Sequence, residues 1–130
     1  MNDHYKTHGA FSWNELMTTD VEGAKKFYAG LFGWEYELFE GMEYSVVKAA
    51  GQKEGQAGIM TMPPDVPPGT RPSWGGYVTV DDVDATAQKA KSLGGQLLFG
   101  PMDIPKVGRF AVIQDPQGAV ISAITYKMEM

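Results

Sequence analysis

Apolar and polar residues follow the same order of patterns in two successive blocks of this chain. Each block begins with an alternating run, continues with apolar residues at helical spacing, and ends with three further alternating runs. Alternation with a period of two predicts strands, and apolar residues three and four positions apart predict an amphipathic helix. The predicted strands are 10–19, 34–39, 43–49 and 56–62 in the first block, and 74–80, 96–102, 109–114 and 119–126 in the second. Each block is therefore predicted to be a β-α-β-β-β module.

The two blocks also match residue by residue around their helices. Asp20 matches Asp82 and Gly33 matches Gly95, and each pair is 62 positions apart. Each Asp stands where a helix should begin and can cap it, and each Gly stands where the helix should end. A repeat of this length is not that of a solenoid. It predicts two similar modules that face each other and enclose a cleft.

A proline-rich segment separates the blocks. Residues 63–72 read Pro-Pro-Asp-Val-Pro-Pro-Gly-Thr-Arg-Pro. Proline removes a backbone donor and is excluded from helix interiors and central strands, so this segment is predicted to be a linker. Another turn is predicted at 115–118, where Asp-Pro-Gln-Gly suits a type I turn. The chain is read as one domain with a first module at 10–62 and a second at 73–126.

Composition narrows the classes of function. The 130 residues include 11 Lys and Arg against 16 Asp and Glu, for a net charge of −5, and the basic residues are scattered. No nucleic-acid-binding surface is expected from that distribution. The absence of cysteine excludes disulfides and cysteine nucleophiles. Residues 1–9 are polar and no apolar run reaches membrane-spanning length, so we expect a cytoplasmic protein without membrane contact.

Two stretches of sequence resemble a known family. They are Asp20-Val-Glu-Gly-Ala-Lys-Lys-Phe-Tyr28 with Leu31-Phe-Gly-Trp34, and Val107-Gly-Arg-Phe-Ala-Val-Ile-Gln-Asp-Pro-Gln-Gly-Ala119. In a doubled β-α-β-β-β pattern they resemble the vicinal oxygen chelate superfamily of glyoxalases, extradiol dioxygenases and bleomycin-resistance proteins. They are most similar to the branch described as predicted enzymes related to lactoylglutathione lyase. The resemblance implies an α+β fold in which two modules form a cupped, mixed sheet around a cleft, and it implies a homodimer.

The resemblance further implies a divalent metal ion, with ligands from the first and a late strand of each module. The corresponding positions here are Trp13, Gly75, Ser122 and the pair Ile59–Met60. Indole, glycine and aliphatic groups offer no suitable donor, and a neutral serine hydroxyl is a weak one. The only histidines, His4 and His8, lie on what reads as a mobile tail before the first strand. We therefore predict no metal and no other cofactor.

Strand alternation predicts which side chains line the cleft. If Trp13 faces it, Glu15 and Met17 do so too, and Leu16 faces the helix. The same reasoning places Tyr77 and Ser122 in the cleft. The predicted ligand-binding residues are Trp13, Met17, Trp74, Tyr77, Arg109 and Ser122. Together they describe an aromatic, largely apolar pocket for a small molecule.

Glu15 is the predicted catalytic residue. A carboxyl on a concave sheet face is partly desolvated, which suits a general base or an anchor for a ligand amine. The alternative is a structural salt bridge, for example with Arg109 or across a dimer interface. Likewise, Trp13, Trp74 and Tyr77 are either a stacking surface or ordinary core aromatics, and Arg109 is either a carboxylate-binding group or a surface residue. The glycines at 51, 55 and 58 are assigned to a mobile hairpin.

Three functions remain open from the sequence. The first is a metal-free protein that binds a small organic molecule, of the bleomycin-resistance kind. The second is a lyase or isomerase related to lactoylglutathione lyase. The third is a structural or regulatory module whose cleft is filled by its own side chains.

Overall fold

The computed structural model describes residues 3–39, 43–64 and 66–127. Contacts divide the chain into two compact units. The N-terminal unit is the continuous segment Trp13–Trp74, and the C-terminal unit combines the residues up to Ser12 with those from Gly75 onward.

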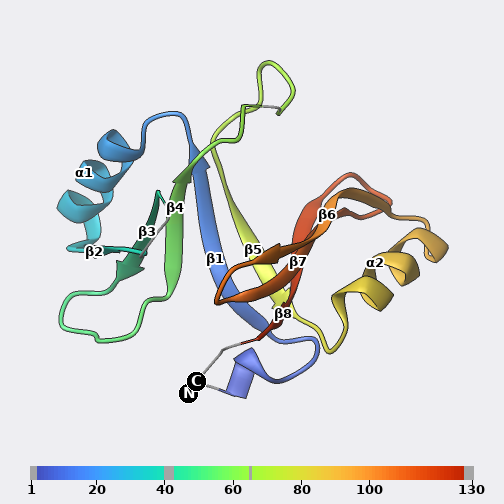
Figure 1. The fold of residues 1–130 in the computed structure, drawn as a ribbon. Coiled ribbons are helices and arrows are strands. Elements are labelled where there is room, and N and C mark those ends of the chain that lie inside the picture. Colours follow the sequence, from blue (N-terminus) through green and yellow to red (C-terminus); the bar gives the residue numbers. More distant parts are fainter. Residues whose placement is uncertain (1–2, 40–42, 65, 128–130) are drawn as a thin grey trace. The chain divides into compact units, whose positions relative to one another are not determined.

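The N-terminal unit is a half-sheet with one helix against it (Figure 1). Its elements are β1 (Phe11–Thr18, of which the first two residues belong to the other unit), α1 (Val21–Phe32), β2 (Glu35–Leu38), β3 (Tyr44–Lys48) and β4 (Ala57–Thr61). The strand order is β2-β3-β4-β1. β1 and β4 are parallel, whereas β2–β3 and β3–β4 are antiparallel. The predicted β-α-β-β-β order is confirmed for this module.

One face of this half-sheet packs against α1. Leu16, Val47 and Ile59 form its buried centre, and α1 adds Ala24 and Tyr28. Neighbouring residues on each strand point to opposite faces. We call the face that packs on the helix the first face, and the opposite one the second face. Trp13, Glu15 and Met17 alternate with Leu16 and so lie on the second face.

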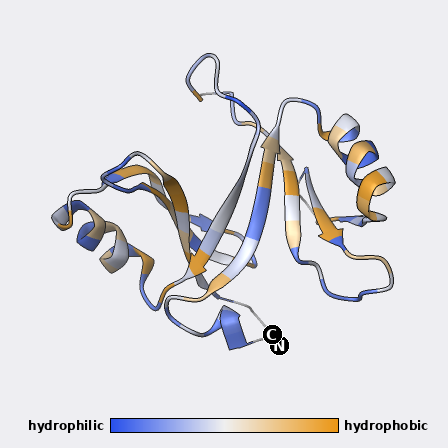
Figure 2. Ribbon diagram, turned by 180° about the vertical axis from the view of Figure 1, so that it is seen from behind, coloured by the Kyte–Doolittle hydropathy of each residue, from blue (hydrophilic) through white to orange (hydrophobic). Residues whose placement is uncertain are grey.

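The C-terminal unit has the same arrangement. Its elements are β5 (Ser73–Thr79, beginning in the N-terminal unit), α2 (Val83–Ser92), β6 (Gln96–Ile104), β7 (Gly108–Gln114) and β8 (Val120–Tyr126). The strand order is β5-β8-β7-β6, with β5 and β8 parallel and the other pairs antiparallel. Val83 of α2 packs on Ala111, Ile113 and Ala123 of the first face. Figure 2 shows polar and apolar residues striping both helices, as amphipathic packing requires.

The predicted caps and the predicted turn are present. Asp20 Oδ1 accepts a hydrogen bond from the Gly23 N–H at 2.9 Å, and Asp82 Oδ1 accepts one from the Ala85 N–H at 3.2 Å. Gly33 ends α1 in the left-handed conformation at φ 75°. The 115–118 turn is closed by a 3.0 Å bond from the Gly118 N–H to the Asp115 carbonyl. Local sequence chemistry therefore fixes the start of both helices and the end of α1. The helix α2 ends at Ser92 with Leu93 as its C-cap, and the left-handed glycine after it is Gly94 at φ 92° rather than Gly95.

The segment before β1 is not a loose tail, contrary to the expectation from sequence. Residues Asp3–Tyr5 form a 3-10 helix. The Thr79 hydroxyl donates to the His4 carbonyl at 2.6 Å, and the His8 ring Nδ1 accepts from the Asp81 N–H at 3.0 Å. Gly9 N–H donates to the Thr79 carbonyl at 2.7 Å. These bonds attach the segment to β5 and to the turn after it. Within the described ranges, neither helix has the length and apolarity needed to cross a bilayer.

Candidate functional site

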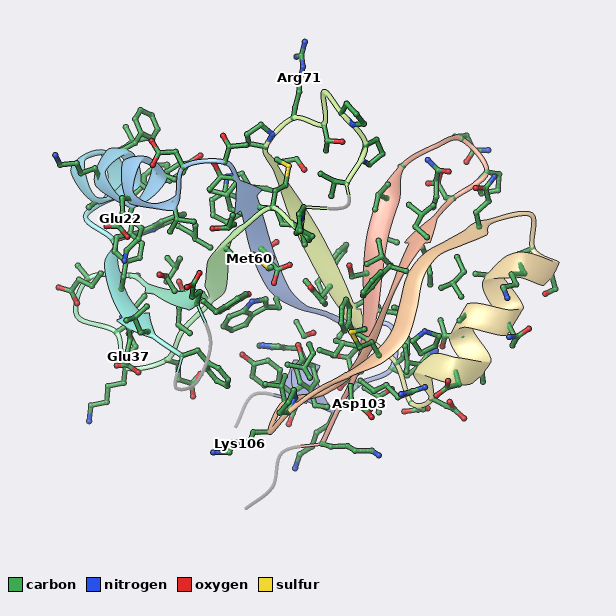
Figure 3. All side chains as sticks on the ribbon, turned by 45° about the horizontal axis from the view of Figure 1, so that its top comes forward. Glu22, Glu37, Met60, Arg71, Asp103 and Lys106 are labelled. Atoms are coloured by element: carbon green, nitrogen blue, oxygen red, sulfur yellow. The ribbon has the colours of Figure 1, made fainter. Side chains whose placement is uncertain are left out.

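Strand register brings polar and flexible side chains together on the second face of the N-terminal unit. Glu15 on β1 lies opposite Gly58 on β4, and Met17 lies opposite Met60. Met60 in turn lies opposite Tyr44 on β3. Because opposite residues in a sheet share a face, all five positions belong to the second face. Met60 is labelled in Figure 3.

A short hydrogen-bonded chain crosses this face. The Tyr44 hydroxyl donates to Glu15 Oε2 at 2.7 Å and accepts from the Trp13 indole Nε1–H at 2.8 Å. We call this the Glu15–Tyr44–Trp13 chain. Glu15 is only 8% exposed, so its carboxyl is held within the protein rather than in bulk water. Buried polar groups linked in this way have fixed orientations and hold their neighbours in register.

Gly58 makes this chain possible. A Cβ at this position would overlap the Tyr44 ring, so only glycine lets the ring cross β4 to reach Glu15. Assigning Gly58 to a mobile hairpin was therefore wrong: it is a buried residue within β4. Tyr44 was missed in the sequence. Its only signal was a tyrosine on the strand next to a glycine, and single-sequence patterns do not give the pairing of those two strands.

Arg109, the cation proposed as a partner for Glu15, is bound elsewhere. Its Nε donates to Asp84 Oδ2 at 2.9 Å and its Nη2 to Asp84 Oδ1 at 3.1 Å. Its Nη1 reaches Asp103 Oδ1 at 3.2 Å; Asp103 is labelled in Figure 3. The hydrogen bonds from Arg109 lower the pKa of Asp84, and those to the two aspartates raise the pKa of Arg109. Arg109 alternates with Phe110 and shares the first face with Ala111, on the side of α2.

The second face of the C-terminal unit carries a different set of groups. Tyr77 lies opposite Ser122, as the sequence predicts for residues that share a face. The Tyr77 and Phe110 rings are 6.3 Å apart between centroids. At the far end of β8, burial raises the pKa of Tyr126 to about 12. The 2.7 Å hydrogen bond between the Tyr126 and Ser12 hydroxyls acts in the opposite direction and only partly offsets this rise in pKa. Ser122 lies between Tyr77 of β5 and Val112 of β7 in the sheet, so its neighbours on this face are aromatic and aliphatic.

Trp74 does not join either of these groups. Its indole Nε1 donates to the Tyr28 hydroxyl at 3.1 Å, and its ring meets that of Trp34 edge-on at 5.8 Å. These partners place Trp74 beside α1, in the N-terminal unit. Next to it is a hollow of about 340 Å³, lined by Asn14, Trp34, Val47, Gln56, Ala57 and Trp74.

The side chains at the implied ligand positions do not fit a divalent ion. The Trp13 nitrogen carries a hydrogen that it donates to Tyr44, so it has no lone pair to offer. Ile59 is fully buried on the first face, and Met60 offers only a soft thioether. Among the residues that the structure describes, no three His, Cys, Asp or Glu side chains gather as a metal site.

Comparisons with known proteins agree with this architecture. The model of the Glyoxalase/Bleomycin resistance protein/Dioxygenase superfamily matches residues 4–122. The chain belongs to this superfamily. The family and the α+β fold implied by the sequence resemblance are both confirmed. Among solved structures, homoprotocatechuate 2,3-dioxygenase from Brevibacterium fuscum superposes with a TM-score of 0.63 at 15% identity, over 92% of this chain and 37% of that one. At that identity the likeness concerns the fold alone.

Two curated relatives are more similar in sequence. CFP32 of Mycobacterium tuberculosis, whose name assigns it provisionally to the glyoxylases, is 44% identical over an alignment of 119 positions that covers 89% of this chain and 44% of that protein. The anthracycline biosynthesis protein DnrV of Streptomyces peucetius is 31% identical over 128 residues, covering 88% of this chain and 46% of that protein. This chain therefore spans a little under half the length of these relatives.

Proposed function

We propose that this glyoxalase-family chain binds a small organic molecule on the second face of its N-terminal unit without a metal ion. Glu15 is proposed as the anchor for a hydrogen-bond donor on the ligand, and Trp13 as an aromatic wall. The observation that carries the proposal is the Tyr44 hydroxyl, which lies 2.7 Å from Glu15 and 2.8 Å from Trp13. It links an acidic group to an indole across a strand that carries no side chain at Gly58.

The chemistry of these residues suits an amine attached to a flat ring system. A ligand ammonium group makes a charge-assisted hydrogen bond to a carboxylate, which is stronger than the bond from a neutral phenol. Such a ligand would therefore displace the Tyr44 hydroxyl from Glu15 or share the carboxylate with it. An indole beside the carboxylate adds stacking and cation–π attraction.

Two methionines favour an adaptable site over a rigid one. Met17 and Met60 are opposite one another on the same face, and both are partly exposed. Methionine side chains are flexible and polarizable, so they fit ligands of varied outline. This supports binding of a bulky organic molecule rather than recognition of a single small metabolite.

The name of one relative suggests a probe. DnrV is named as an anthracycline biosynthesis protein. Anthracycline glycosides combine a planar polycyclic chromophore with an amino sugar, which is the combination of flat ring and amine described above. We propose this compound class as a test ligand for the chain.

The test is a thermal-shift and calorimetric titration with daunorubicin, alongside its aglycone, which lacks the amino sugar. We expect daunorubicin to raise the melting temperature by mass action, the aglycone to do so less, and Glu15→Gln to abolish the shift without lowering the melting temperature of the free protein. Glu22→Gln, on the exposed side of α1 (labelled in Figure 3), is the matched control and should bind like the unmodified chain. Unchanged binding by Glu15→Gln would remove the assignment of Glu15.

Metal analysis tests the proposal that binding does not require a metal ion. We expect the purified protein to contain no stoichiometric zinc, nickel, iron or manganese, and the thermal shift to survive dialysis against a chelator. A stoichiometric transition metal, lost together with ligand binding on chelation, would instead favour the lyase or isomerase alternative.

A further inference from the structure

We propose that the N-terminal unit has another binding site, beside α1, for a flat, uncharged heteroaromatic ring with a hydrogen-bond donor next to an acceptor, as on a nucleobase. The site is the hollow of about 340 Å³ lined by Asn14, Trp34, Val47, Gln56, Ala57 and Trp74, which we call the tryptophan hollow. It shares no lining residue with the Glu15–Tyr44–Trp13 chain. Its volume is within the range of about 300–1,000 Å³ that small-molecule pockets occupy.

The two tryptophan walls are held in place before any ligand arrives. Trp34 directly follows Gly33, whose left-handed conformation turns the chain at the end of α1. The Trp34 ring stacks on Tyr28 with centroids 5.2 Å apart, and the Tyr28 hydroxyl accepts the 3.1 Å bond from Trp74. One residue of α1 therefore fixes both walls. A wall that is already ordered loses little conformational freedom when a ligand binds.

The angle between the walls defines the shape of the ligand. The Trp34 and Trp74 rings are inclined at 80° with centroids 5.8 Å apart, so they form a corner rather than a slot. A flat ring that stacks on one indole meets the edge of the other, and both arrangements are favourable for aromatic pairs. Val47 and Ala57, both buried, provide the apolar floor.

The rim of the tryptophan hollow sets the polarity of the ligand. Asn14 and Gln56 are exposed, and their side-chain amides make no hydrogen bond with any residue that the structure describes. Each carboxamide offers a donor and an acceptor in one plane. The same pair of groups recognises the adjacent donor and acceptor on adenine. None of the six lining residues is charged, so a neutral ring is favoured over an ion.

Adenosine is the probe for this proposal, and purine riboside, which lacks the exocyclic amino group, is the matched comparison. Titration of the isotope-labelled chain at millimolar concentrations is followed by NMR. We expect adenosine to shift the indole N–H signals of Trp34 and Trp74 and to leave that of Trp13 in place. Purine riboside should bind more weakly because it lacks the donor.

Variants distinguish the contribution of the polar rim to adenosine binding from that of the tryptophan walls. Asn14→Leu and Gln56→Leu should each weaken adenosine binding about tenfold, the loss expected for one good donor–acceptor pair. Gln88→Leu, an exposed glutamine on α2, should bind like the unmodified chain and controls for a glutamine lost at the surface. The dispersion of the remaining signals reports whether each variant is folded.

The outcomes are distinct from those of the proposed function. Glu15→Gln should leave adenosine binding unchanged, because Glu15 is not part of the tryptophan hollow. The proposal is overturned if adenosine at millimolar concentration shifts neither Trp34 nor Trp74, if it shifts Trp13 alone, or if both rim variants bind adenosine as tightly as the unmodified chain.

Discussion

The N-terminal and C-terminal units place similar side chains on the first face of their half-sheets and different ones on the second. The parallel strand pairs of the two units can be aligned by their register. The pair Glu15 and Gly58 in the N-terminal unit then corresponds to the pair Tyr77 and Ser122 in the C-terminal unit. On the first face, Leu16 then corresponds to Val78, and both are apolar residues that pack in their unit's core. Packing against a helix therefore imposes the same requirement in both units.

On the second face the correspondence breaks down. Tyr44, opposite Met60, corresponds to Phe110, opposite Ile124. Phe110 lacks the hydroxyl that links Tyr44 to Glu15 and Trp13 in the N-terminal unit. The duplicated backbone thus supports a hydrogen-bonded chain in one copy and aromatic contacts in the other. The two units therefore differ in chemistry on the second face, which does not pack against the unit's helix.

The largest effect should come from the core of the first face. Ile59 is fully buried in the N-terminal unit, and the corresponding position in the other unit is the smaller Ala123. We expect Ile59→Ala to lower the free energy of unfolding by about 3 kcal/mol through lost burial and a cavity. Urea denaturation measures this change. Leu38→Ala, at a residue 71% exposed, is the control and should cost less than about 0.5 kcal/mol.

An exchange on the second face should have the next largest effect. Gly58→Ser places a side chain where the Tyr44 ring lies, so we expect a loss of about 2 kcal/mol as the ring is displaced from Glu15. The reverse change at the corresponding position, Ser122→Gly, should cost only about 0.5–1 kcal/mol, from backbone entropy. Equal costs in urea denaturation would show that the two second faces do not differ as described.

The helix caps should respond alike in both units. Asp20 and Asp82 each accept a bond from the backbone N–H three residues later. We expect Asp20→Ala and Asp82→Ala to lower the free energy of unfolding by about 1 kcal/mol each. The corresponding Asn variants, which can still accept this bond, should retain most of the stability. A difference between the two units would mean that one cap depends on further contacts.

The smallest effect concerns acid stability in the C-terminal unit. Arg109 lowers the pKa of Asp84 below its ordinary value of 3.8, so the folded state favours the charged carboxylate. Stability from this pair is complete above that value and is lost as the pH falls through the lowered pKa. We expect Asp84→Asn to flatten the decrease in stability that sets in as the pH falls below 3.8. Salt should shrink the difference, since Asp84 is at the surface. A decrease as steep as that of the unmodified chain would assign the acid sensitivity to other carboxyls.

Much of the fold could be predicted from the sequence because local rules determine it. Strand alternation, the Asp20 and Asp82 caps, and the turn at 115–118 depend on neighbours within a few residues. The chain from Glu15 to Tyr44 could not be predicted, since it spans three strands and requires the missing side chain of Gly58. The hydrogen bond that holds Trp74 against Tyr28 joins residues 46 positions apart, which no local pattern reveals.

The segment before β1 also depends on partners that are distant in the sequence. Residues up to Ser12 pack with the C-terminal unit, through bonds such as that from Thr79 to His4, whereas Trp13–Trp74 is one uninterrupted stretch. On the ribosome, the uninterrupted unit has all of its contacts available once residue 74 has emerged. The other unit must wait for β8 to be complete, because Tyr126 of β8 contacts the Tyr5 ring and is hydrogen-bonded to Ser12. Translation of residues 13–74 therefore separates the segment before β1 from every partner that anchors it.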